Sequence, residues 1–170
     1  MKKFGIFLLI IGIIFMIYNT YESVSKWYKF KKGCSSYLKL AGDAPNIQKA
    51  DEFLKQALDY MEQKNLTSGN SAYIFPTPQS NLSIWYEQIK GTKETVSELI
   101  QKGENSTQLE KDNALMKIRE VVLDQGEKGT HVTLPPNITW YPKHWVMLFD
   151  WIVSILLICI GGYLIFREYY

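Results

Sequence analysis

The chain contains two long apolar runs with a mostly polar region between them. Residues 4–18 form the first run and residues 145–166 form the second. The second run is about 22 residues long, enough for a helix to cross a hydrocarbon core of about 30 Å. The first run supplies only about 15 residues, so its helix has to include residues 19–24 to cross. We therefore predict transmembrane helices at residues 1–24 and 145–166, with the lipid bilayer as a partner.

The first run has the outline of a signal peptide, because Lys2 and Lys3 precede it. The sequence Asn-Thr-Tyr-Glu at residues 19–22 lacks the small-x-small pattern of a cleavage site. An uncleaved signal anchor is therefore predicted, with Tyr21 and Trp27 at the membrane interface.

Apolar residues in the middle region recur every three or four positions, which is the spacing of amphipathic helices. The first helix is predicted to continue unbroken from the first span to Gly42, with one face formed by Val24, Tyr28, Cys34, Leu38 and Ala41. The second begins at Asp43 and Pro45, and its apolar positions are Ile47, Ala50, Leu54, Ala57 or Leu58, and Met61.

The third helix has the strictest pattern and ends at Gly103, a typical C-terminal residue. Its apolar face is formed by Leu82, Trp85, Ile89, Thr92, Val96 and Leu99. Thr107 and Glu110 have the spacing of a capping box, which starts a fourth helix. That helix has Leu115, Ile118 and Val122 on one face, and the sequence Asp-Gln-Gly-Glu-Lys-Gly at residues 124–129 ends it.

Four amphipathic helices joined by turns bury their apolar faces most economically as an antiparallel bundle. The predicted fold class is therefore all-α: two transmembrane helices bracketing an extracytoplasmic antiparallel four-helix bundle at residues 25–126, whose first helix is continuous with the first span. Residues 127–144 are predicted to be an extended juxtamembrane linker with a short strand at residues 131–134, because prolines punctuate this segment. Residues 167–170 are expected to form a short cytoplasmic tail.

The charges beside the first span give two conflicting indications of topology. Four lysines lie within residues 26–32, whereas Lys2 and Lys3 precede the span. The positive-inside rule applies to short loops, and a region as long as the middle one translocates largely regardless of charge. The short positive N-terminus then decides, which places both termini in the cytoplasm and the middle domain in the periplasm or outside the cell. The expected location is the plasma (inner) membrane.

Composition argues against several classes of function. The net charge is only +2 and acids and bases are interspersed, so a nucleic-acid partner is not expected. Cys34 and Cys159 are predicted to be free thiols, because one lies near water and the other in the second span. His131 and His144 have no metal-ligand neighbours at the required spacing, and no phosphate loop or nucleophile motif is present. We expect no enzyme activity, no cofactor and no metal site.

The middle region and the segment after it resemble a known group of proteins. The run "NLTSGNSAYIFPTPQSNLSIWYEQIK", followed by "QLEKDNALMKIREVVLDQGEKG" and an aromatic segment before a last apolar span, resembles a group of uncharacterised bacterial two-span membrane proteins with an extracytoplasmic helical domain. The resemblance covers residues 45–142 and implies no activity. Gln79 and Ser80 stand where that group has acidic residues, and Ser83 stands where it has a glycine.

The loop between the second and third helices is a candidate partner-binding site. It carries Tyr73, Ile74 and Phe75 beside two prolines, and the pair Trp85 and Tyr86 starts the next helix. Aromatic side chains in a proline-stiffened loop lose little conformational entropy when they dock on a partner. The alternative is that the three apolar side chains of the loop fold back to close the end of the bundle.

Asp150 is the candidate inside the membrane, about one and a half turns into the second span. At that depth a carboxylate reaches headgroups and water, or it pairs with a base in a protein contact, either Lys26 or a residue of another subunit. Gly161 and Gly162 lie further along the same helix and allow a neighbouring helix to approach closely.

Two non-enzymatic functions remain open. The first is an interaction or accessory subunit of a larger membrane assembly, bound to a membrane protein or to itself. The second is an extracytoplasmic ligand-sensing module that signals through a partner, because two spans bracketing four helices is also the layout of chemoreceptor input modules. The short expected tail favours the first, and the sequence does not specify a small-molecule ligand.

Overall fold

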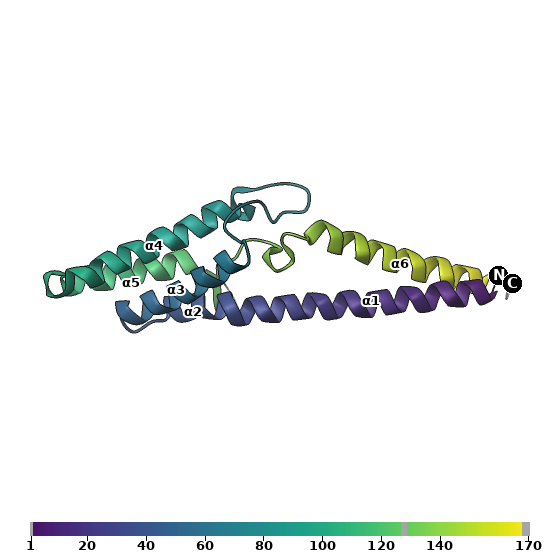
Figure 1. Cartoon of the computed structure of the whole chain (residues 1–170), viewed down its shortest axis with the longest axis horizontal. Helices are drawn as coiled ribbons and strands as arrows, with labels where there is room; N and C mark the ends of the chain where they lie inside the picture. Colours follow the sequence, from purple (N-terminus) through teal and green to yellow (C-terminus); the bar gives the residue numbers. More distant parts are fainter. Residues whose placement is uncertain (1, 127–128, 168–170) are drawn as a thin grey trace. The chain divides into compact units, whose positions relative to one another are not determined.

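A computed structural model of the chain describes residues 2–126 and 129–167, and the chain is mostly helical (Figure 1). It divides into two compact units. The hairpin unit comprises residues 1–27 and 139–170, and the middle unit comprises residues 28–138. Residues 127 and 128 of the predicted linker and residues 168–170 of the predicted tail lie outside the described residues.

The hairpin unit is built from α1 (Lys2–Phe30) and α6 (His144–Phe166), with η4 (Ile138–Trp140) before α6. Within the described residues, the helix that starts at Lys2 and the helix His144–Phe166 are long and apolar enough to cross a membrane. Most of their apolar side chains face outward, as expected of helices that face lipid rather than a protein core. Both predicted spans are therefore helical, and both are long and apolar enough to cross a membrane.

The helix of the first span continues into the middle unit, but one segment differs from the prediction. The five residues of η1 (Lys31–Ser35) form a π-helical turn between α1 and α2 (Ser36–Gly42). Phe30, not Tyr28, joins Cys34, Leu38 and Ala41 in the core, while Val24 and Tyr28 are exposed. The predicted face was wrong at those two positions. Tyr28 precedes Cys34 by six residues, about 1.7 turns at 3.6 residues per turn, so it lies on another side of the helix, and Val24, four residues before Tyr28, lies on that same side.

The next two helices follow the predicted apolar patterns, although the second predicted helix begins at Ile47 rather than at Asp43 and Pro45, because Asn46 caps its N-terminus. In α3 (Ile47–Gln63) the side chain of Asn46 accepts a hydrogen bond from the Lys49 N–H, and the apolar positions are buried. In α4 (Leu82–Lys102) Asn81 caps the N-terminus, and all six predicted face residues are buried. Gly103 ends α4 with φ of 57°, a conformation that glycine adopts without strain.

The fourth predicted helix forms as α5 (Gln108–Val122), with the predicted capping box between Thr107 and Glu110. Its buried residues are Ala114, Ile118 and Val122, so Ala114 takes the place predicted for Leu115. Residues 114, 118 and 122 are each four apart and return to one face, which position 115 leaves by about 100°.

A β-hairpin follows α5 where an extended linker was predicted. β1 (Leu123–Gly126) pairs in antiparallel register with β2 (Gly129–Val132), and Asp124 lies opposite His131. The Thr133 N–H also donates to the Val122 carbonyl at 2.9 Å. The strand therefore lies at residues 129–132 rather than 131–134. Leu123 is buried in this arrangement. Burial of its side chain favours the end of the helix immediately after Val122.

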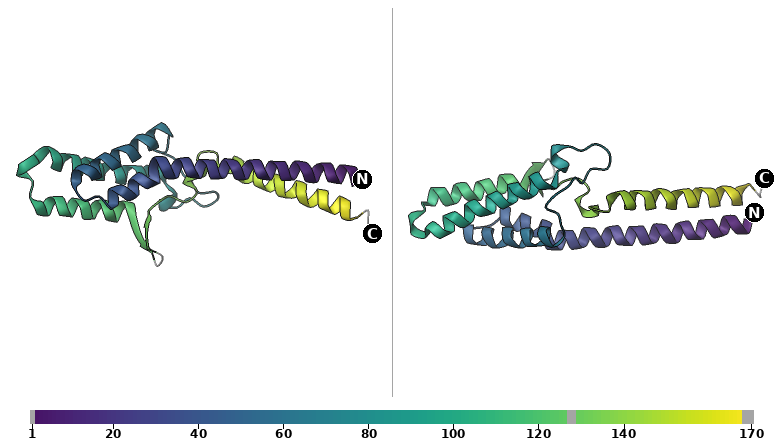
Figure 2. Two further views of the ribbon diagram at one scale, coloured as in Figure 1. Left: turned by 90° about the horizontal axis from the view of Figure 1, so that it is seen from below. Right: turned by 45° about the horizontal axis from the view of Figure 1, so that its top comes forward.

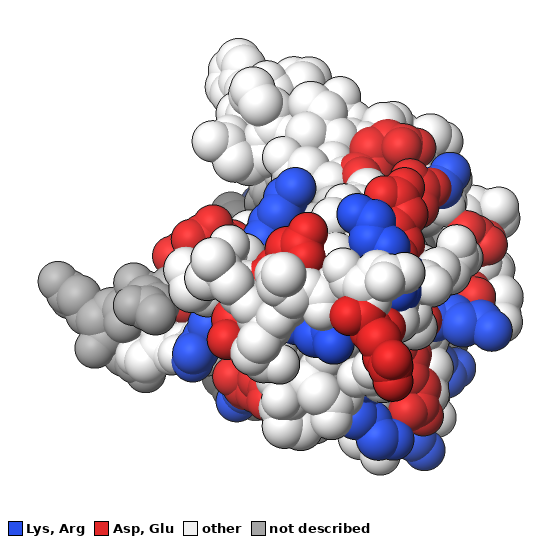
Figure 3. Space-filling model, turned by 90° about the vertical axis from the view of Figure 1, so that its left-hand side faces the viewer, with Lys and Arg blue, Asp and Glu red and all other residues white. Residues whose placement is uncertain are grey.

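The helices of the middle unit share one core. α3 contacts α2, α4 and α5, and α5 also contacts α2 and α4 (Figure 2). The largest fully buried aliphatic side chains are spread over all four helices: Leu38, Ile47, Leu54, Leu82, Ile89, Val96 and Ile118. Basic and acidic side chains are interspersed on the end of the unit that carries η3 (Gly103–Asn105), as Figure 3 shows. That end has no single-sign field for a highly charged partner.

Candidate interaction site

The loop between α3 and α4 is closed at its base by main-chain hydrogen bonds. Asn70 and Asn81 form an antiparallel bridge, and the Ser71 N–H donates to the Ser80 carbonyl at 2.9 Å. One step outside this pair, the Leu82 N–H donates to the Gly69 carbonyl at 2.9 Å. Ser71 and Ser80 are fully buried, so the base of the loop is part of the packed structure.

The second half of the loop is further fixed by η2 (Pro78–Ser80). The Thr77 N–H donates to Ser80 Oγ at 2.9 Å, and Ser80 Oγ donates to the Thr77 carbonyl at 2.9 Å. Pro78 at the start of this turn has a fixed φ and needs no N–H partner. The base of the loop and its second half, from Thr77 on, are therefore held in place by hydrogen bonds.

The three candidate residues at the outer part of this loop differ in burial. Ile74 is 68% exposed and Phe75 is 80% exposed, whereas Tyr73 is partly buried. Ile74 and Phe75 thus do not fold back to close the end of the helices, the alternative that the sequence left open. Two large apolar side chains presented on an anchored loop have the character of docking anchors.

The aromatic pair at the start of α4 is buried and hydrogen-bonded within the chain. The Trp85 Nε1–H donates to the Thr133 carbonyl at 3.1 Å, which ties α4 to the segment after β2. The Tyr86 hydroxyl donates to Glu62 Oε1 of α3 at 2.7 Å. This hydrogen bond is the largest cause, ahead of burial and neighbouring carboxylates, that raises the pKa of Tyr86 to about 12. Both rings are therefore packed within the middle unit rather than presented on its surface.

A shallow hollow of about 260 Å³ lies beside the same loop. Its lining comes from three segments that are far apart in the sequence: Pro78 and Gln79 of the loop, Ile84, Trp85 and Gln88 of α4, and residues 133–135 after β2. Trp85 contributes to this lining although it is only 6% exposed. Sequence reasoning missed the contribution of residues 133–135, because nothing in their spacing predicts which helix they contact.

In the hairpin unit, Asp150 has no ion pair with any described residue. Lys26, the intramolecular base proposed for it, pairs instead with Glu22 at 2.9 Å and donates to Met147 Sδ at 3.3 Å. The pairing with Lys26 was therefore wrong, because Glu22 lies one helical turn before Lys26 on the same helix. Asp150 is half-buried, and its backbone carbonyl accepts a hydrogen bond from Ser154 Oγ at 2.7 Å.

A polar contact that sequence reasoning missed joins α1 to α6. Asn19 Nδ2 donates to Ser154 Oγ at 3.3 Å, and both side chains are almost fully buried. The contact could have been predicted from the presence of one small polar residue in each apolar helix, since such groups need a hydrogen-bond partner away from water. The contact gives two buried polar groups a hydrogen-bond partner.

The two candidate glycines of α6 occupy different surroundings. A Cβ atom at Gly161 would lie 2.7 Å from the Gly5 carbonyl oxygen and 2.7 Å from the Leu9 nitrogen, both on α1. A Cβ atom at Gly162 would meet nothing within 4 Å. Gly161 thus permits close packing of α1 and α6, while Gly162 is open to another helix or to lipid.

No group of three or more His, Cys, Asp and Glu side chains among the described residues is arranged to hold a metal ion. Comparison with protein families, with curated proteins and with solved structures finds no match to this chain.

Proposed function

We propose that this chain is a non-enzymatic integral membrane protein that acts as an interaction or accessory subunit of a larger membrane assembly. The observation that carries the proposal is the exposure of Ile74 and Phe75 on a loop whose base is hydrogen-bonded and buried. Burial of two such side chains against a partner contributes binding free energy, and the fixed base of the loop lowers the cost of ordering the segment that carries them.

The proposed arrangement has α1 and α6 as two membrane spans and both termini in the cytoplasm. The helices α2 to α5 then form a four-helix bundle on the outer face of the plasma membrane. The apolar outward faces of α1 and α6 support the first part, and the contacts of α3 and α5 with their neighbours support the second. Relationship to the two-span bacterial group named from the sequence is part of the same proposal.

A photoreactive amino acid at position 75 tests the partner directly, in the full-length chain in native membranes. Irradiation is expected to join position 75 to one membrane protein. The same probe at Leu109, which is 69% exposed on α5, serves as the control and is expected to give no such adduct. The change Ile74→Ser beside the probe should reduce the yield about tenfold, because it removes one apolar anchor.

Equal labelling from positions 75 and 109, or adducts with lipid alone, would contradict the interaction role. A chain isolated as a dimer whose crosslinking at position 75 responds to a small molecule would select the alternative, a ligand-sensing module that signals through a partner.

A further inference from the structure

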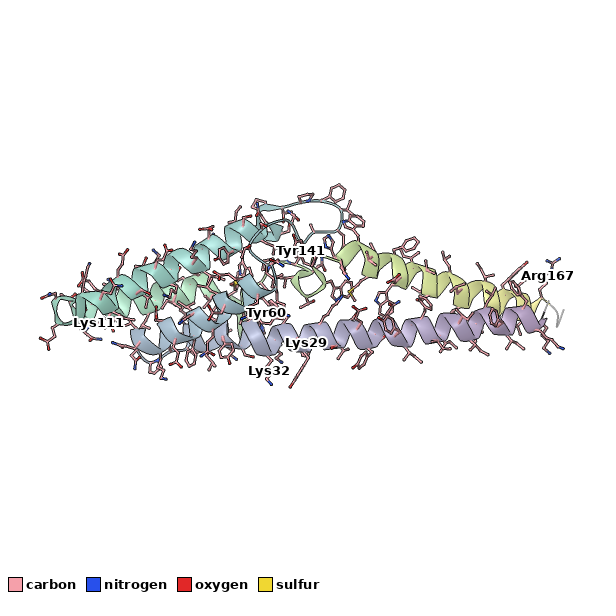
Figure 4. All side chains as sticks on the ribbon, viewed as in Figure 1. Lys29, Lys32, Tyr60, Lys111, Tyr141 and Arg167 are labelled. Carbon is pink, nitrogen blue, oxygen red and sulfur yellow. The ribbon has the colours of Figure 1, made fainter. Side chains whose placement is uncertain are left out.

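The first turns of the middle unit enclose a groove that none of the interaction residues above uses. Its volume is about 520 Å³. Three tyrosines, three lysines and one glycine line it: Tyr28, Lys29, Lys32, Gly33, Tyr37, Tyr60 and Lys64. Figure 4 labels Lys29, Lys32 and Tyr60, which lie close together where α1 passes into η1.

The groove depends on the π-helical turn and on the glycine within it. A Cβ atom at Gly33 would collide with the ring of Tyr60, so only glycine lets α3 bring this ring against the helix backbone. The Tyr60 ring also packs edge-on against Phe30, with centroids 6.1 Å apart, and Tyr37 stacks on Phe53 at 6.5 Å. Two aromatic walls of the groove, Tyr60 and Tyr37, are therefore held in place by packing. Short π-helical turns within α-helices frequently occur at functional sites.

The charge inside the groove is uncompensated. Lys29, Lys32 and Lys64 make no ion pair with any described residue, and no Asp or Glu is among the described residues that line the groove. Like charges gathered in a concave surface raise the local potential and attract anions. The tyrosine rings alone would suit an organic cation, but three ammonium groups would repel it.

We propose that this groove binds a phosphate group, with the lysine ammonium groups of residues 29, 32 and 64 around the anion and the tyrosines beside its organic substituent. Lysine binds phosphate as a mobile point charge, and the Tyr60 hydroxyl supplies a neutral donor. Burial is the main factor that raises the pKa of Tyr60, which keeps this hydroxyl protonated at neutral pH.

The anionic headgroup of a phospholipid is the source that the chain favours. Lys29 follows Val24, the end of the predicted span, by five residues, and a rise of about 1.5 Å per residue places it about 8 Å further along α1. Lysines at that distance lie within about one Debye length of the bilayer surface and are attracted to anionic lipids in the leaflet that they face. The lipid source depends on the proposed membrane placement, whereas phosphate binding by the groove does not.

Native mass spectrometry of the full-length chain in detergent tests the site with two probes, phosphatidylglycerol and soluble glycerol 1-phosphate. The groove variant carries Lys29→Gln, Lys32→Gln and Lys64→Gln. The control variant carries Lys55→Gln, Lys111→Gln and Lys117→Gln, which removes the same charge elsewhere; Lys111 lies at the opposite end of the middle unit (Figure 4). All three groove lysines are exposed, so their substitution should leave folding intact, and circular dichroism checks this.

The wild type is expected to retain phosphatidylglycerol about tenfold more strongly than phosphatidylcholine. The groove variant should lose this preference, while the control variant and a groove variant with arginines at the three positions should keep it. Binding of glycerol 1-phosphate that the groove variant loses, without a preference between the lipids, would identify a soluble phosphate as the source. Equal losses in the groove and control variants, or no difference between the wild type and the groove variant with either probe, would overturn the proposal.

Discussion

At the scale of single residues, Tyr86 couples the stability of the middle unit to pH. Because the pKa of Tyr86 is raised to about 12 in the folded chain, against 10 as its ordinary value, the hydroxyl stays protonated at pH values where an unfolded tyrosine ionises. Its contribution to stability is therefore complete below about pH 10 and is lost as the pH rises through about 12.

The change Tyr86→Phe tests this coupling in the full-length chain. We expect a loss of about 1 kcal/mol at pH 8, since the hydrogen bond to Glu62 is removed. The difference in melting temperature between wild type and variant should then shrink from pH 10 to pH 12. A difference that stays constant over this range would show that the Tyr86 hydroxyl titrates normally.

The residue scale also shows where sequence reasoning reaches its limit. The spacing in α4 predicts the burial of Trp85 and Ile89, because a helix has one periodicity and one apolar face. The spacing does not predict the hydrogen bonds from the Tyr86 hydroxyl to Glu62 and from the Trp85 indole to Thr133, since other elements supply those partners. The exposure of Ile74 and Phe75 is likewise not predicted, since they lie in a loop outside any helical spacing.

At the scale of elements, α1 and α6 pack through a glycine on each helix, and the pair Gly161 and Gly162 supplies its own control. The change Gly161→Ala places a methyl group 2.7 Å from the α1 backbone and should destabilise the hairpin by about 1–3 kcal/mol. The change Gly162→Ala meets no neighbouring atom and should stay within about 0.5 kcal/mol. Unfolding of the full-length chain in SDS, followed by tryptophan fluorescence, measures both, and similar losses would contradict the close packing at Gly161.

The core face of α4 gives a second prediction at this scale. Ile89→Asp puts a carboxylate among fully buried aliphatic side chains and should cost several kcal/mol, on the order of 3–5, because the charge has no partner there. Gln88→Asp, one position away on the exposed side, is the matched control and should cost little. Thermal unfolding followed by circular dichroism separates them, and an unmoved transition in Ile89→Asp would remove this residue from the core.

Elements whose signals are local were predictable, and those that depend on distant contacts were not. Gly103 and the Thr107–Glu110 pair mark helix ends through backbone freedom or their own side chains, so the C-terminal end of α4 and the start of α5 follow from the sequence. The π-helical turn at Lys31–Ser35 accommodates the Tyr60 ring from α3, and the β1–β2 hairpin accompanies burial of Leu123. Neither cause is visible in the spacing of neighbouring residues.

At the scale of the whole molecule, the proposed topology predicts how the chain is exposed on each side of the membrane. A reporter enzyme fused after residue 170 should be active only in the cytoplasm. Protease added to spheroplasts should cleave the middle unit, with the exposed loop around Phe75 as an early site. A C-terminal reporter that is active outside the cell would refute this arrangement.

The closed base of the loop at residues 70–81 separates partner binding from folding stability, two properties that usually depend on the same residues. Its hydrogen bonds hold the chain at Gly69 and Leu82, and Ile74 and Phe75 in the outer part are exposed, so these two side chains contribute little to the shared core of α2 to α5. Mutations at the exposed positions 74–76 are then expected to have little effect on folding, and a foreign segment grafted there would be displayed rather than packed. In the proposed role, changes at Ile74 and Phe75 would then alter partner choice with little effect on stability.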